Sequence, residues 1–276
     1  MKVAALQMVS GMDRDANLQQ AKSLLEQAAQ QGAELAVLPE YFCLLGQRDT
    51  DKLFIQEPFG QGPIQAFLAN MARTLKLWIV GGTLPLSAPS GGQEASGRVF
   101  NSSLAYSPQG ACVARYDKIH LFRFDNGHER YDESRSLMPG EAPTRFELPS
   151  RDGHVWRIGM SVCYDLRFAE LYRRYALEGA DLLLVPSAFT HTTGQAHWEV
   201  LLRARAIENQ AFVVAAAQGG LHDNGRRTWG HSMLVDPWGA LLAQQPDGAG
   251  VVVAEFDHGV LQQQRARLSA LSHRVL

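Results

Sequence analysis

The sequence has few cysteines, few lysines and no long apolar run. Its three cysteines, Cys43, Cys112 and Cys163, are odd in number and widely spaced, which excludes a disulfide framework and a CxxC metal site. No apolar run approaches the length that spans a bilayer. The first residues, MKVAALQM, turn polar too soon for a secretion signal. We therefore expect a cytoplasmic protein with no membrane partner.

An excess of positive charge is absent as well. Lysine and arginine total 26 against 28 acidic residues, so no polybasic surface for nucleic acid or membrane is expected. The sequence has no HExxH motif, and no GxGxxG follows the first predicted strand, which argues against a zinc protease and a Rossmann dinucleotide site. We expect neither a metal nor an organic cofactor. What is present is 46% apolar residues over 276 positions, enough for one large α/β domain.

Apolar runs of strand and helix type alternate along the chain, which favours an α/β fold. In the first part the pattern predicts strands at 2–8, 34–40 and 77–83, helices at 15–31 and 62–75, and a hairpin over 99–116 with its turn at 107–110. The second part repeats this order, with strands at 155–163, 180–187 and 211–218, helices at 168–178 and 195–209, and a hairpin over 229–244 with its turn at 236–239.

An internal duplication explains this repeated order. GAELAVLPEYF (32–42) and GADLLLVPSAF (179–189) are identical at five of eleven positions. One β-α-β-α-β-β unit cannot cover both faces of its sheet, whereas two units packed sheet to sheet form a four-layer αββα sandwich. Residues 122–154 lack a regular pattern and are expected to be a long excursion, which in compact domains is often functional. The expected boundaries within one domain are halves at about 1–121 and 155–256 and a C-terminal tail at 257–276.

Three residues that could carry chemistry follow predicted β segments. Cys163 stands where a strand passes into a helix, whose N-terminus would favour the thiolate, although a lone cysteine is also a common buried residue. Glu40 ends a buried strand, where a carboxylate is costly unless it is paired or functional. Lys118 has apolar neighbours, but a lysine can also extend from a sheet edge to water. Ligands in open α/β folds bind beyond the C-terminal ends of strands, so the three could share one site.

Their chemistry is complementary if they meet. Glu40 can take the proton of the Cys163 thiol, which then attacks a carbonyl carbon. The Lys118 ammonium and the backbone N–H of Tyr164 can donate to the oxyanion that develops.

Three motifs in this order are typical of one family. LPEYF (38–42), YDKIHLF (116–122) and CYDLRF (163–168) resemble the nitrilase superfamily of carbon–nitrogen hydrolases, whose members use a Glu-Lys-Cys triad. The stretches at 186–220 and 230–239 are very similar to its Nit branch. The resemblance covers almost the whole chain and implies an αββα sandwich, amidase activity without a cofactor, and a homodimer or larger homo-oligomer.

The resemblance also implies a substrate and further site residues. In this family a second glutamate, here Glu133 in YDESRSLMPGE, supports the triad. The branch hydrolyses amides of a five-carbon α-keto acid, so deaminated glutathione would yield α-ketoglutarate and cysteinylglycine. The carboxylate of such a substrate suits an arginine fork, for which Arg167 is the candidate, with Phe189 and Thr193 beside it.

Two other functions remain open at this point. One is an ω-amidase acting on α-ketoglutaramate, or another short-chain aliphatic amidase. The other is a non-catalytic ligand-binding protein with the same fold. His197 and Trp198 are expected to serve packing in the helix that contains LLRARAIEN, with Arg203, Arg205 and Glu208 in a salt-bridge network.

Overall fold

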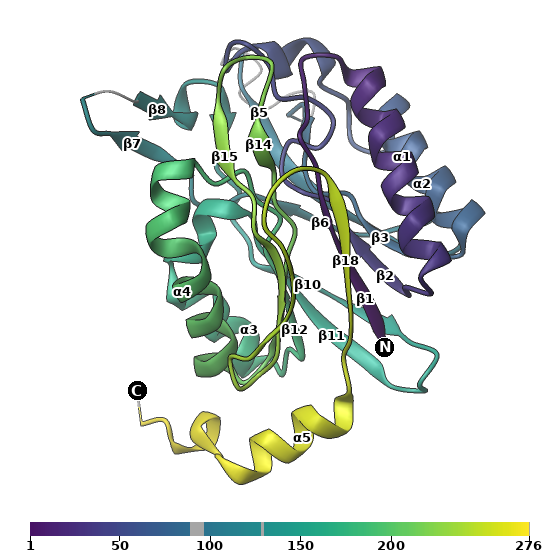
Figure 1. Ribbon diagram of the computed structural model, residues 1–276, viewed down its shortest axis with the longest axis vertical. Coiled ribbons are helices and arrows are strands. Elements are labelled where there is room, and N and C mark those ends of the chain that lie inside the picture. The colour runs from purple at the N-terminus through teal and green to yellow at the C-terminus, as the bar shows by residue number, and fades with distance from the viewer. Residues whose placement is uncertain (89–96, 128–129, 276) are drawn as a thin grey trace.

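The computed structural model describes residues 1–88, 97–127 and 130–275. Two main β-sheets lie between two layers of helices, which gives the predicted αββα sandwich (Figure 1). Helices α1 (Arg14–Gln30) and α2 (Pro63–Leu75) cover the first sheet, and α3 (Ala169–Leu177) and α4 (His191–Asn209) cover the second. The large apolar core lies between the sheets, with contributions from both, and a second core lies under α1 and α2.

The strand order of the first sheet is β18-β1-β2-β3-β5-β4, with β6 and β9 also paired to β5. Its strands are β1 (Lys2–Gln7), β2 (Leu35–Val37), β3 (Trp78–Val80), β4 (Leu84–Leu86), β5 (Val99–Tyr106), β6 (Cys112–Asp117), β9 (Leu137–Met138) and β18 (Gly250–Glu255). The second sheet has the order β10-β11-β12-β13-β16-β17. Its strands are β10 (Thr144–Pro149), β11 (Val155–Met160), β12 (Leu182–Leu184), β13 (Phe212–Ala215), β16 (Ser232–Val235) and β17 (Leu241–Gln245).

The remaining elements are short. Two small antiparallel pairs join β7 (Arg123–Asp125) to β8 (Arg130–Asp132) and β14 (Gly219–Leu221) to β15 (Arg227–Trp229). The others are the helix α5 (His258–Arg267) and the 3₁₀ segments η1 (Asp51–Ile55), η3 (Glu133–Arg135), η4 (Cys163–Arg167) and η5 (Ala270–His273).

The two sheets repeat one plan, as the duplication predicts. In each, three parallel strands are followed by an antiparallel hairpin. Glu34 and Asp181, the third residues of the two repeated motifs, accept equivalent hydrogen bonds. Trp78 N donates to the Glu34 carbonyl, and Phe212 N donates to the Asp181 carbonyl, both at 2.9 Å. The sequence similarity therefore reflects equivalent places in the two sheets.

Each sheet also has an edge strand that the sequence pattern did not predict. β10 comes from the 122–154 excursion and pairs antiparallel with β11, while β18 pairs antiparallel with β1. The excursion also contains the β7–β8 hairpin and β9, so regular strands form there although the sequence pattern did not indicate them. The expected halves, 1–121 and 155–256, consequently do not coincide with the two sheets.

Local signals account for the helix ends. The Asp13 side chain accepts hydrogen bonds from the first turn of α1, and Gly32, at φ 82°, follows its end. Pro63 occupies the first position of α2. α4 begins at His191, four residues before its predicted start, because Thr190 caps it by accepting from the Thr193 N–H.

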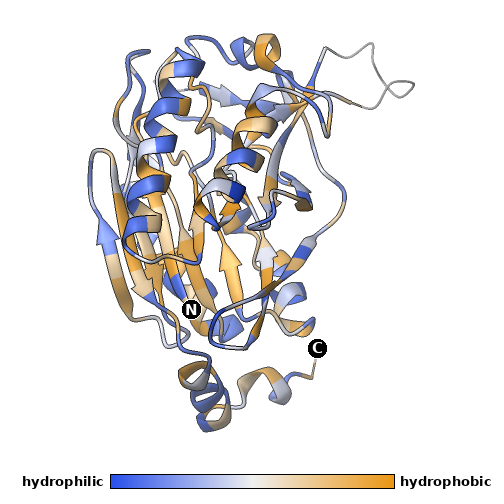
Figure 2. Ribbon diagram, turned by 90° about the vertical axis from the view of Figure 1, so that its right-hand side faces the viewer, coloured by the Kyte–Doolittle hydropathy of each residue, from blue (hydrophilic) through white to orange (hydrophobic). Residues whose placement is uncertain are grey.

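Hydropathy follows this layered arrangement. Figure 2 shows apolar residues concentrated on the strands and polar residues on the outward faces of the helices. Trp198 is buried, as predicted, and its Nε1 donates to the His231 carbonyl at 2.8 Å. Among the described residues, no helix is both long and apolar enough to cross a membrane.

Candidate active site

Four predicted residues, which follow strands of both main sheets and the β7–β8 hairpin, converge at one site. Glu40 follows β2, Lys118 follows β6, Glu133 begins η3 and Cys163 begins η4 directly after β11. The Lys118 Nζ lies 2.9 Å from Glu40 Oε1 and 2.8 Å from Glu133 Oε2, and its side chain is 0% exposed. A buried ammonium is thus held between two carboxylates.

Glu40 is oriented by both halves of the duplication. Its Oε1 accepts from the Asn101 side chain at 2.9 Å, besides Lys118, and its Oε2 accepts from the Ala188 backbone N–H at 2.9 Å. Ala188 follows Ser187, the repeat counterpart of Glu40. The sequence reasoning missed Asn101 and Ala188, although aligning the repeated motifs places Ala188 at the matching strand end.

Glu133 is fixed from the other side of Lys118. Its Oε1 accepts from the Tyr41 hydroxyl at 2.8 Å and its Oε2 from the Phe122 N–H at 2.6 Å. Burial opposes ionisation of Glu133, but the charges of Lys118 and Lys52 outweigh it and lower the pKa of this carboxyl. Burial would likewise lower the pKa of Lys118, yet the charges of Glu133 and Glu40 raise it well above its ordinary value. Lys118 therefore stays charged at neutral pH.

Cys163 occupies a constrained turn. Its φ of 50° lies in the left-handed region that only a small share of non-glycine residues adopt, and its N–H donates to the Pro186 carbonyl at 3.0 Å. The residue is 8% exposed. Burial, followed by the negative charge of Glu40, raises the pKa of its thiol well above the usual value. Cys163 begins a 3₁₀ segment of 5 residues and not an α-helix, and the net shift of its pKa is upward, so the thiol needs a base when it attacks.

Asp165 holds this turn and was missed by the sequence reasoning. Its carboxylate accepts from the Val162 N–H at 2.8 Å, the Tyr116 hydroxyl at 2.7 Å and the His120 N–H at 3.0 Å. Tyr116 and His120 flank Lys118 by two residues on either side. One buried carboxylate thus fixes the nucleophile turn relative to the lysine segment. The sequence did contain a clue to this role, because Asp165 lies within CYDLRF and its partners Tyr116 and His120 lie within YDKIHLF.

A pocket of about 210 Å³ opens beside Cys163. It is lined by Phe122, Cys163, Tyr164, Arg167, Ala188, Phe189, Thr190 and Thr193. The structure therefore brings the three predicted substrate-binding residues to the predicted nucleophile. We call this space the thiol pocket.

Arg167 lies over aromatic rings in the thiol pocket. Its guanidinium carbon is 5.3 Å from the ring centre of Phe189 and 5.8 Å from that of Tyr164. Its Nη1 lies 3.2 Å from Nδ1 of His197, which is exposed, so His197 does not have the packing role expected of it. Within the part of the chain that the structure describes, Arg167 has no carboxylate within 4.0 Å, which leaves its charge for an anion.

The salt-bridge network expected on α4 forms only in part. Arg205 Nη1 pairs with Glu208 Oε1 at 2.7 Å, and its Nη2 donates to the Leu166 carbonyl of η4 at 2.8 Å. Arg203 instead pairs with Glu199 at 3.2 Å. Arg205 thereby links α4 to the segment that carries the nucleophile.

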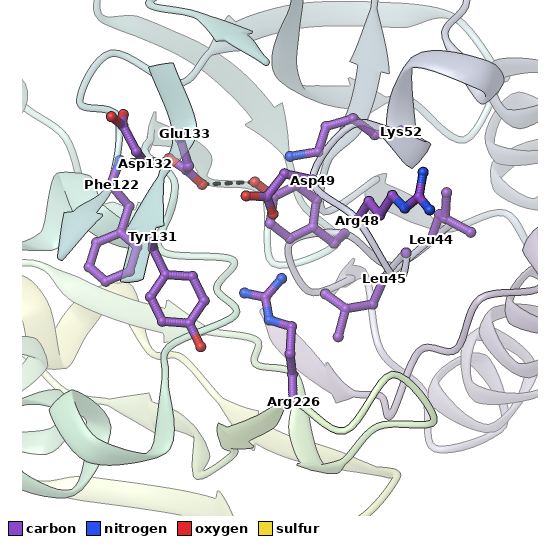
Figure 3. Close-up of a pocket in the computed structure, with 12 residues that line it drawn as sticks. Leu44, Leu45, Arg48, Asp49, Lys52, Phe122, Tyr131, Asp132, Glu133 and Arg226 are labelled. Atoms are coloured by element: carbon purple, nitrogen blue, oxygen red, sulfur yellow. Dashed lines mark hydrogen bonds between the residues drawn. The ribbon is translucent and has the colours of Figure 1, made fainter. Parts of the chain in front are cut away.

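A second pocket, of about 470 Å³, shares Phe122 with the thiol pocket. Figure 3 draws the residues that line it. Its lining residues are Tyr41, Leu44, Leu45, Gly46, Arg48, Asp49, Lys52, Phe122, Tyr131, Asp132, Glu133 and Arg226. We call it the cationic pocket, after Lys52 and Arg226. Neither residue was predicted as part of the site, because they come from η1 and from the turn between β14 and β15.

A separate cluster could offer metal ligands. Among the described residues, His154, Asp181 and His258 place one ligand atom each within 4.8 Å of the others. They lie at the N-terminal ends of β11 and β12 and at the start of α5, whereas Cys163 follows the C-terminal end of β11. Asp181 already bonds to Arg265 at 3.1 Å, so the cluster has its own counter-charge and lies apart from the candidate active site.

Comparison with known proteins decides the family. Residues 2–266 match the family model for carbon–nitrogen hydrolases. The chain belongs to the carbon–nitrogen hydrolase family. This confirms the predicted superfamily and the type of enzyme.

The hydrolase is similar to curated proteins along almost its full length. It is 41% identical over 274 residues to the deaminated glutathione amidase of Synechocystis, covering 99% of this chain and 97% of that protein. It is 37% identical to the chloroplastic omega-amidase of Arabidopsis thaliana, covering 93% of this chain and 67% of that one.

Solved structures share the fold of the hydrolase. The C. elegans NitFhit protein superposes with a TM-score of 0.87 at 36% identity; the match covers 99% of this chain and 65% of that longer one. A Nesterenkonia amidase variant has a TM-score of 0.76 at 27% identity and 98% coverage of both chains. Its active site cysteine has undergone Michael addition of acrylamide.

Proposed function

We propose that this hydrolase cleaves the amide of deaminated glutathione, releasing α-ketoglutarate and cysteinylglycine. The observation that carries the proposal is the buried Lys118 between Glu40 and Glu133, next to a pocket that contains both Cys163 and Arg167. Relatives with the name deaminated glutathione amidase support the choice of substrate.

The proposed reaction proceeds through an acyl-thioester. Glu40 takes the proton of the neutral Cys163 thiol while the sulfur attacks the amide carbonyl carbon. The Lys118 ammonium and the Tyr164 N–H stabilise the oxyanion, and one such donor is typically worth about a hundredfold or more in rate. Glu40 then returns the proton to the departing amine. In the second half, Glu40 activates a water that displaces Cys163 from the acyl group.

The remaining predicted residues bind the substrate or position the lysine. Arg167 receives the carboxylate of the α-keto acid, where a planar guanidinium gives two parallel donors. Phe189 and Thr193 form the wall of the thiol pocket beside it. Glu133 orients Lys118, to which it is directly bonded. These roles need no metal or organic cofactor.

The test compares the hydrolysis of two substrates by the wild-type protein and by alanine variants at two cysteines. Wild type should have a higher kcat/KM for deaminated glutathione than for α-ketoglutaramate, and Cys163→Ala should lose more than about a thousandfold because the nucleophile is gone. Cys112→Ala is the matched control, since Cys112 is exposed and outside the site. A preference for α-ketoglutaramate would instead support the omega-amidase alternative, which the Arabidopsis relative favours. If neither substrate is cleaved, the result would support the alternative of a non-catalytic ligand-binding protein.

We further propose a cytoplasmic homodimer that folds as one domain. The shared core between the two sheets supports a single domain. The three cysteines are free, which suits a reducing compartment. Exposed apolar side chains at Val200 and Ile207 of α4 and at Trp238 support a subunit interface.

A further inference from the structure

The cationic pocket has no role in the reaction as proposed so far, yet it adjoins the reacting groups. Glu133 and Tyr41 line it directly, and Phe122 lines both it and the thiol pocket. An amide whose acyl part lies in the thiol pocket can therefore direct its amine part past Phe122 and Glu133 into this space. Its lining residues, drawn in Figure 3, surround about 470 Å³ of space that is continuous with solvent, so its occupant need not be as small as ammonia.

Three cations line the pocket, and two of them, Lys52 and Arg226, come from distant parts of the chain and lie beside aromatic rings. The Lys52 Nζ lies 4.9 Å from the ring centre of Tyr41, and the Arg226 guanidinium carbon lies 5.1 Å from that of Tyr131. Figure 3 shows both charged groups directed toward the space in front of Glu133. Aromatic rings thus support each cation without neutralising it.

Neither cation forms a direct ion pair with a described acid. In the ranges that the structure describes, Lys52 and Arg226 have no carboxylate within 4.0 Å. The nearby Glu133 is already bonded to Lys118, Tyr41 and the Phe122 N–H. Of the other acids that line the pocket, Asp132 accepts from Ser134 and Asp49 is exposed.

The direction of the Lys52 pKa agrees with a site that binds an anion. Burial lowers the pKa of this lysine from its ordinary value, and the charges of Glu133 and Asp49 oppose that change only in part. A half-buried cation without a directly paired acid is costly, and an anion placed between Lys52 and Arg226 would reduce that cost.

We propose that Lys52 and Arg226 bind a carboxylate on the leaving amine, so that the enzyme selects amides of short peptides over primary amides. The inference rests on the proposed function, because cysteinylglycine ends in a carboxylate and the ammonia released from α-ketoglutaramate does not. It assigns the two pockets to the two ends of one dianionic substrate: Arg167 to the keto acid, and Lys52 with Arg226 to the peptide.

The test measures a discrimination ratio. Its two substrates are deaminated glutathione and the same compound with a carboxamide in place of the terminal carboxylate. The ratio of their kcat/KM values should be about 10 to 100 in wild type, in line with the strength of charged hydrogen bonds. It should fall toward one in Lys52→Met and in Arg226→Met, mainly through KM for the acid. Any general loss of activity affects both substrates and cancels in the ratio.

Two further variants act as controls. Lys52→Arg keeps the charge and should keep most of the discrimination. Lys22→Met removes an exposed lysine of α1 that pairs with Glu26, far from the pocket, and should leave the ratio unchanged.

The outcomes separate this inference from the proposed function. If wild type cleaves the acid and the carboxamide equally well, the proposed function stands and the inference is wrong. It is also wrong if the ratio persists in both methionine variants. If wild type cleaves α-ketoglutaramate but neither of the larger amides, the proposed function fails and the inference fails with it.

Discussion

At the scale of single residues, the charge of Glu40 has two opposite effects on Cys163. As the proposed base, Glu40 accelerates amide hydrolysis, yet after burial its negative charge is the main cause that raises the pKa of the resting thiol. Glu40→Gln should therefore lower amide hydrolysis by about 10²- to 10⁴-fold and at the same time shift thiolate formation at Cys163 to lower pH. A role in folding alone would not produce this opposition.

The measurement is the rate of iodoacetamide alkylation against pH, with each cysteine followed by mass spectrometry. The exposed Cys112 serves as an internal control in the same sample, and its profile should not move. If Glu40→Gln retained hydrolysis, or if the Cys163 profile moved to higher pH, the assignment of Glu40 as the base would have to be abandoned.

At the scale of elements, α5 stabilises the second sheet through one arginine. Arg265 donates to Asp181 Oδ1 at 3.1 Å and to the carbonyls of Ala180 and Gln210, at 2.7 and 3.0 Å. Asp181 is buried at the start of β12. Arg265→Met should lower the free energy of unfolding by about 3 kcal/mol, because it leaves a buried carboxylate without its closest cation.

Arg267→Met is the matched control, since Arg267 lies on the same helix and is exposed. It should change stability by less than about 0.5 kcal/mol. Urea unfolding of both variants measures the difference. Equal effects of the two substitutions would mean that α5 contributes only its apolar contact at Leu261.

The sequence predicted the elements that have a local hydrophobic or turn pattern. It missed the elements that depend on contacts with residues far away in the chain. The repeated motif at 32–42 and 179–189 indicated the paired sheets, because buried strand, turn and helix signals recur at the same spacing. The α5 segment has only Leu261 buried, so no apolar stripe marked it as a helix. β18 is apolar enough to be a strand, but its pairing with β1 depends on residues at the opposite end of the chain.

The same division between local patterns and distant contacts applies to the residues of the candidate site. Glu40, Lys118 and Cys163 stand in motifs whose residue types match one reaction, so their convergence could be expected. Lys52 lies in the 3₁₀ segment η1 and Arg226 in a turn, neither with such a pattern, and only the tertiary structure brings them together. The direction of the Cys163 pKa also depended on burial and on the charge of Glu40, neither of which the position before a helix reveals.

At the scale of the whole molecule, the outer face of α4 bears on assembly. Val200 is 69% exposed, and Ile207 lies seven residues further on, on the same side of the helix. A side chain at Gly239 would contact Ile207, which places the turn that carries Trp238 beside this face. Apolar groups gathered in this way on a surface are typical of a subunit interface.

Val200→Glu should therefore convert the proposed dimer into monomers, because two buried glutamates would face each other across a symmetric interface. Sedimentation velocity at several protein concentrations measures this. Phe54→Glu is the control: Phe54 is 86% exposed but lies in η1, away from α4. A wild-type protein that sediments as a monomer throughout would disprove the dimer. If the Val200→Glu protein stays dimeric, the subunit interface lies on another face of the molecule. Because the first turn of α4 lines the thiol pocket through Thr193, assembly on this helix would also hold one wall of the active site in place.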